Sequence, residues 1–90
     1  MRHPVNLRDY HGTLTELARE IADFRYDALA EFIGYLADDL TRQAESDGKR
    51  GRPQLSRTVD NLTEDLYNAQ KKMEKAWRLS KPHMKPEDLL

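Results

Sequence analysis

The chain of 90 residues contains no cysteine, which excludes disulfide bonds and thiolate metal ligands. It has no run of about 18 uncharged apolar residues, so we expect no membrane-spanning helix and no membrane partner. The N-terminus lacks the apolar core of a signal peptide, and we expect a cytoplasmic protein. No charge predominates, because 15 basic residues balance 16 acidic ones. A net charge of -1 creates no global field that attracts nucleic acid or anionic lipid.

Known catalytic patterns are also absent. The sequence contains no Gly-rich phosphate loop, no His-Glu-x-x-His pattern and no Gly-x-Ser-x-Gly pattern. The three histidines, His3, His11 and His83, lie outside the helices predicted below. We therefore predict no catalytic residue, no cofactor and no metal ligand, and we expect a protein that is not an enzyme.

The positions of the few prolines and glycines predict a first long helix. Thr13 and Glu16 have the spacing of a capping box, in which each residue satisfies a backbone amide of the other. From there to about Glu45 the chain has no proline and a single glycine. These features predict one continuous helix over residues 13–46.

A second helix is predicted after a glycine-rich break. Pro53 suits the first turn of a helix, and Lys81 and Pro82 stop the pattern, so we predict a helix over residues 53–80. The short connection favours an antiparallel hairpin. The expected organisation is a flexible N-terminal arm at 1–12, a helical-hairpin domain at 13–80 and a flexible C-terminal tail at 81–90.

The two predicted helices differ in how much apolar surface they present. The second has one heptad seam, the spacing that packs helices side by side: Leu55, Val59, Leu62, Leu66, Ala69, Met73, Ala76 and Ser80. The first has two, which together cover roughly 240° of a helical wheel. One consists of Leu14, Ala18, Ile21, Arg25, Ala28, Phe32 and Tyr35, and the other of Ala22, Tyr26, Leu29, Ile33, Leu36 and Leu40.

This asymmetry predicts self-association. A helix with two seams needs two neighbours, and the chain offers only one, so an apolar face is left for another molecule. We expect two hairpins to pair into a homodimeric four-helix bundle. The predicted dimer interface consists of Ala22, Tyr26, Leu29, Ile33, Leu36 and Leu40, together with Arg25.

Arg25 is a charge within the apolar arc of the first helix. One interpretation makes it a specificity device in the dimer interface or a contact for an acidic partner. The other lets its aliphatic stem lie along the apolar surface while the guanidinium reaches water.

The segment 49–53 gives an alternative function. Lys49 precedes an Arg-Gly-Arg-Pro sequence that resembles the core of an AT-hook, a family whose arginines lie in the narrow minor groove of A·T-rich DNA. The resemblance implies that Arg50 and Arg52 read the groove. The competing interpretation is a solvated turn or a contact for another anion.

We therefore expect a non-catalytic homodimeric helical scaffold, adaptor or regulatory protein that acts through protein–protein contacts. The first alternative is a DNA-associated protein that uses Lys49, Arg50 and Arg52. The second alternative is a bundle that binds a metal or small molecule, suggested by the acidic residues Glu16, Glu20, Asp23, Asp27 and Glu31. We expect those carboxylates to form a solvated stripe instead, because bundle metal sites also use helical histidines.

Overall fold

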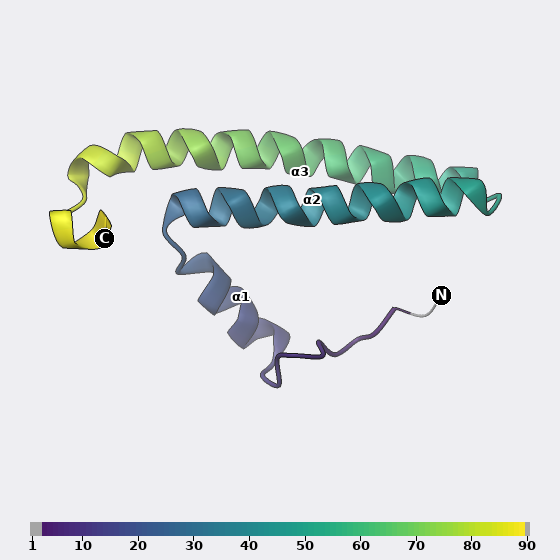
Figure 1. The fold of residues 1–90 in the computed structure, drawn as a ribbon, viewed down its shortest axis with the longest axis horizontal. Coiled ribbons are helices and arrows are strands. Elements are labelled where there is room, and N and C mark those ends of the chain that lie inside the picture. The colour runs from purple at the N-terminus through teal and green to yellow at the C-terminus, as the bar shows by residue number, and fades with distance from the viewer. Residues whose placement is uncertain (1–2, 90) are drawn as a thin grey trace.

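The fold is known from a computed structural model that describes residues 3–89. In this range the chain is helical and has no strand (Figure 1), which confirms the predicted all-α class and helical hairpin. The elements are α1 (Leu14–Ala22), α2 (Tyr26–Lys49), α3 (Pro53–Ser80) and the short 3-10 helices η1 (Lys81–His83) and η2 (Pro86–Leu89). None of the described helices is both long enough and apolar enough to cross a bilayer.

The helices α2 and α3 form an antiparallel hairpin (Figure 1). A side chain added at Gly34 would meet Gln70, and one added at Gly48 would meet Ser56, so the numbers of facing residues add up to 104 at both positions. The prediction that α3 covers residues 53–80 is confirmed, with Pro53 in its first turn.

The prediction of one helix over residues 13–46 is wrong. The chain bends between α1 and α2, and Arg25 adopts a non-helical conformation with φ of -54° and ψ of 144° as the N-cap of α2. The bend contains no proline or glycine. Its cause is a new helix start, in which the Asp27 carboxylate accepts hydrogen bonds from the Ala28 amide and from the Arg25 guanidinium.

The capping box predicted at the start of the first helix is confirmed. The Glu16 amide donates to Thr13 Oγ1 at 3.1 Å, and the Thr13 amide donates to Glu16 Oε1 at 3.4 Å. These bonds satisfy amides that a helix start leaves without partners. Thus α1 has its own well-formed beginning, although none of its residues is buried.

Small residues line the contact between α2 and α3. The buried apolar residues of α2 are Ala30, Gly34, Ala37 and Ala44, and α3 contributes the buried Thr63. Ala37 and Ala44 have no exposed surface, whereas no large side chain in the described part of the chain is fully buried. The two helices therefore pack through a narrow line of small residues, and the larger apolar side chains lie beside that line.

The described helices lie in a single layer. The molecule measures 52 × 30 × 18 Å, and its shortest dimension is less than twice the roughly 10–12 Å diameter of one helix. The radius of gyration is 16.1 Å, against about 12 Å for a compact domain of this length. A single layer of helices has no interior between layers in which to bury large side chains.

Candidate interaction surfaces

The main candidate site is a continuous apolar face on one side of the hairpin. On a wheel of 100° per residue, the large apolar residues of α2 and of α3 are each centred roughly 80° from the line of contact between the helices. Because the helices are antiparallel, equal offsets in the same sense bring both groups to the same side of the layer. We call this the apolar face; it consists of Leu29, Ile33, Leu36, Leu40, Leu55, Leu62, Leu66 and Met73.

The apolar face is substantially accessible to solvent. The exposed fractions are 43% for Leu36, 46% for Leu55 and 47% for Leu62. The other members are half-buried, since the neighbouring helix covers only one flank of each. Aliphatic surface of this extent on a small chain is typical of an interaction site.

The structure groups only part of the predicted dimer interface on this face. Leu29, Ile33, Leu36 and Leu40 belong to it, and Tyr26 begins the same helix with 44% of its surface exposed. Ala22 ends α1, on the other side of the bend. Sequence reasoning missed the contribution of α3 to the same face, although the heptad spacing of its leucines was the available signal.

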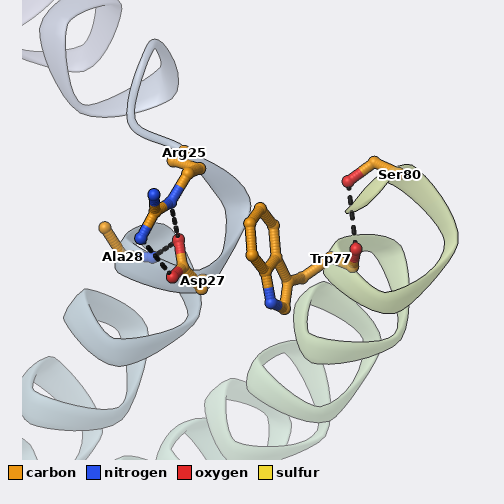
Figure 2. A network of polar contacts seen from close by, with 5 residues as sticks. All are labelled: Arg25, Asp27, Ala28, Trp77 and Ser80. Carbon is orange, nitrogen blue, oxygen red and sulfur yellow. Dashed lines mark hydrogen bonds and ion pairs between the residues drawn. The ribbon is translucent and has the colours of Figure 1, made fainter. Parts of the chain in front are cut away.

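Arg25 links the bend to the far end of α3. Its guanidinium donates to both carboxylate oxygens of Asp27, at 2.7 Å and 2.8 Å. The same group lies 5.0 Å from the centre of the Trp77 ring, and Figure 2 shows the indole between the start of α2 and the end of α3. Arg25 therefore connects the start of α2 to the open end of the hairpin.

Trp77 has two further contacts, with Lys81 and with Ser80. Lys81 Nζ lies 5.9 Å from the ring centre, and the Ser80 hydroxyl donates to the Trp77 carbonyl at 3.1 Å (Figure 2).

The guanidinium of Arg25 holds the pKa of Asp27 below its usual value, because its hydrogen bonds favour the ionised carboxylate more than partial burial disfavours it. Neither predicted interpretation of Arg25 anticipated the stacking partner.

The opposite side of the layer is polar. There the Tyr67 hydroxyl of α3 donates to Asp38 Oδ1 of α2 at 2.5 Å, so a side-chain hydrogen bond joins the two helices. This bond favours the protonated phenol and raises the pKa of Tyr67. Exposed carboxylates surround it on this side, including Glu45, Asp60 and Glu64. The hairpin is thus amphipathic as a whole, with the apolar face on one side and on the other a polar face that also carries basic residues such as Arg42 and Lys71.

The turn between α2 and α3 is compactly folded. Arg50 has φ of -89° and ψ of 10°, and Gly51 has a positive φ of 77°, a conformation that favours glycine. The Arg52 amide donates to the Asp47 carbonyl at 3.0 Å, and the Arg52 side chain lies 3.6 Å from the Asp47 carboxylate. An AT-hook is extended in its complex, so this segment would have to open to resemble one. Lys49 and Arg50 are exposed.

The hollows on the surface are open and modest. One of about 250 Å³ lies where the bend meets the end of α3, lined by Asp23, Phe24, Arg25, Tyr26, Ser80 and Met84. Within residues 3–89, no three histidine or carboxylate side chains converge as they would around a metal ion. The feature that dominates the described surface is therefore the apolar face.

Comparison with protein-family models, with curated protein sequences and with solved structures gave no match to this chain.

Proposed function

We propose that this protein is a non-catalytic homodimeric scaffold or adaptor, in which the apolar faces of two hairpins pack together as a four-helix bundle. The observation that supports this most directly is the single-layer architecture. Stable domains bury apolar surface between at least two layers of secondary structure. A second hairpin, laid face to face on the first, supplies the second layer.

The accessible area supports the same proposal. The chain exposes 7577 Å², whereas a compact monomer of 10.5 kDa exposes about 5,400 Å². The excess is about 2,100 Å² per chain, or roughly 4,000 Å² for two chains, which lies within the 2,000–5,000 Å² range of obligate homodimers. The area is sufficient for a stable dimer without any further molecule.

The paired hairpins would present their polar faces outward. Such a dimer offers two equivalent polar surfaces, each supported by the Tyr67–Asp38 hydrogen bond. Rigid helical surfaces of this kind suit contacts with other proteins, which is the role of a scaffold, an adaptor or a regulatory subunit. We place the function in those contacts rather than in chemistry on a substrate.

Light scattering on the full chain tests the dimer. We expect a mass near 21 kDa at micromolar concentration, twice the 10.5 kDa of one chain. Replacing Leu36 and Leu62 with aspartate puts two charges per chain into the interface, and the mass should fall to that of one chain because buried unpaired charges are costly.

The control is Leu89→Asp, which adds a similar charge at a leucine of η2 outside the apolar face and should leave the mass unchanged. A fully helical wild-type chain that remains at 10.5 kDa across the micromolar range would overturn the proposal.

A further inference from the structure

We propose that α1 of one copy packs against the outer edge of α3 in the second copy, so that each chain contacts its partner through α1 as well as through the apolar face. This inference rests on the proposed dimer and adds a second contact to it. By the outer edge we mean the side of α3 that faces away from α2, formed near its C-terminal end by Lys72, Lys75, Ala76 and Leu79.

The first observation is that α1 is a formed amphipathic helix that packs extensively on no other described helix. Leu14, Leu17 and Ile21 lie on one side of it, yet none is buried, and Leu14 is 69% exposed. In the described chain the extensive helix packing is between α2 and α3 (Figure 1). Isolated helices of about nine residues are marginal in water, so α1 requires a surface to pack on.

The second observation is that the bend directs α1 away from its own hairpin. Arg25 is held in its non-helical conformation by the paired hydrogen bonds to Asp27 and by the stacking on Trp77. Figure 1 shows α1 leaving the start of α2 at an angle, on the side of α2 that faces away from α3. Because α2 stands between them, α1 cannot reach the outer edge of its own α3.

The third observation is that the outer edge of α3 has unused apolar surface and unused positive charge. Leu79 is 64% exposed. Lys72 and Lys75 are exposed, and neither has a carboxylate within ion-pair distance in the part of the chain that the structure describes. A partner for this edge must bring apolar side chains together with negative charge.

The helix α1 has that combination. Glu20 flanks its apolar side, Glu16 lies one turn earlier on its polar side, and its net charge is -1 from these two glutamates and Arg19. Residues 71–79 have a net charge of +3, from four basic residues and one glutamate. In a symmetric dimer this complementary contact occurs twice.

A charge exchange between two chains tests the contact. Variant A has Glu16→Gln and Glu20→Lys, where glutamine preserves the capping box, and variant B has Lys72→Glu and Lys75→Glu. Each variant alone places like charges in both contacts, and we expect its dimer dissociation constant to rise roughly tenfold at low salt. In an equimolar mixture, opposite charges meet again in the A–B dimer, which native mass spectrometry should show as the dominant species.

The control for variant A is Glu45→Gln with Glu64→Lys, which makes the same change in charge on the polar face and should leave the dissociation constant unchanged. Circular dichroism checks that each variant keeps its helix content. If A and B do not prefer each other in the mixture while the wild-type chain is dimeric, the contact between α1 and the outer edge of α3 is refuted and the proposed dimer stands. A monomeric wild-type chain would overturn both.

Discussion

At the scale of single residues, the group of Arg25, Asp27 and Trp77 determines where the long helical segment bends. Asp27 accepts two hydrogen bonds from the guanidinium and one from the amide of Ala28, which satisfies one of the backbone amides that a helix start leaves without an intrahelical partner. The stacking of Arg25 on Trp77 connects this start to a residue far along the chain. The Arg25 side chain therefore contacts both the first turn of α2 and the end of α3.

Asp27 should make this end of the hairpin sensitive to acid. Its pKa is lower in the folded chain than in the unfolded chain, so its stabilising contribution is present above the usual aspartate pKa of about 3.9 and is lost as the pH falls through the folded value. We expect Asp27→Asn to lower the melting temperature at pH 6, and the difference from wild type to shrink as the pH approaches 3. Melting curves followed by circular dichroism at a series of pH values measure this.

Asp60→Asn is the matched control, because Asp60 is exposed and forms no ion pair within residues 3–89. A difference between Asp27→Asn and wild type that stayed constant from pH 6 to pH 3 would contradict the assignment.

At the scale of elements, the sequence predicted best where local residues determine the outcome. The bounds of α3 follow from Pro53 and Pro82, whose rings restrict the backbone on the spot. The capping box of α1 is equally local. The bend at 23–25 escaped prediction because it contains no proline or glycine, and because one partner of Arg25, Trp77, is distant in sequence. The unexpected charge of Arg25 within an apolar seam was its only signal.

The line of small residues between α2 and α3 was missed for another reason. Apolar periodicity gives most weight to leucine, isoleucine and phenylalanine, so it did not predict a helix contact along Ala30, Gly34, Ala37 and Ala44. The helices approach each other along these residues, and the leucines are left for the apolar face. The sequence thus predicted the residues that α2 contributes to the apolar face, but not the residues through which α2 packs against α3.

Enlarging one of these small residues should separate the helices. Ala37 has no exposed surface, so Ala37→Leu forces additional methyl and methylene groups into a filled contact, at a cost of about 1–3 kcal/mol. We expect a lower midpoint in urea unfolding followed by circular dichroism. The control is Ala18→Leu, at an exposed position of α1, where the same change adds no overlap. Equal midpoints for the two variants would show that the α2–α3 contact is loose.

At the scale of the whole molecule, the single layer would couple the stability of the chain to the proposed dimerisation. No large side chain in the described part of the chain is fully buried, so the isolated hairpin has little apolar burial to oppose the conformational entropy of the unfolded state. The second hairpin of the proposed bundle supplies the missing burial. The folded monomer would then be scarce at equilibrium.

The melting temperature should therefore depend on protein concentration. Binding between folded chains stabilises the folded state by mass action, so the melting temperature should rise steadily between about 2 and about 200 µM. Differential scanning calorimetry measures this directly. The variant with Leu36→Asp and Leu62→Asp serves as the reference: because it should not dimerise, we expect low helix content and no transition that moves with concentration. A wild-type melting temperature that is constant over this range would contradict the coupling of folding to assembly.

The antiparallel register also has a consequence for the order in which the hairpin closes. Near the turn, Gly48 meets Ser56 only eight residues later, whereas Arg25 and Trp77 are 52 residues apart. Short loops cost less entropy to close, so α2 and α3 should pair first near the turn and last at the opposite end, where their contact should also open first. The chain has a single tryptophan, and it sits at that fraying end. Its fluorescence should therefore report the last step in the pairing of α2 with α3.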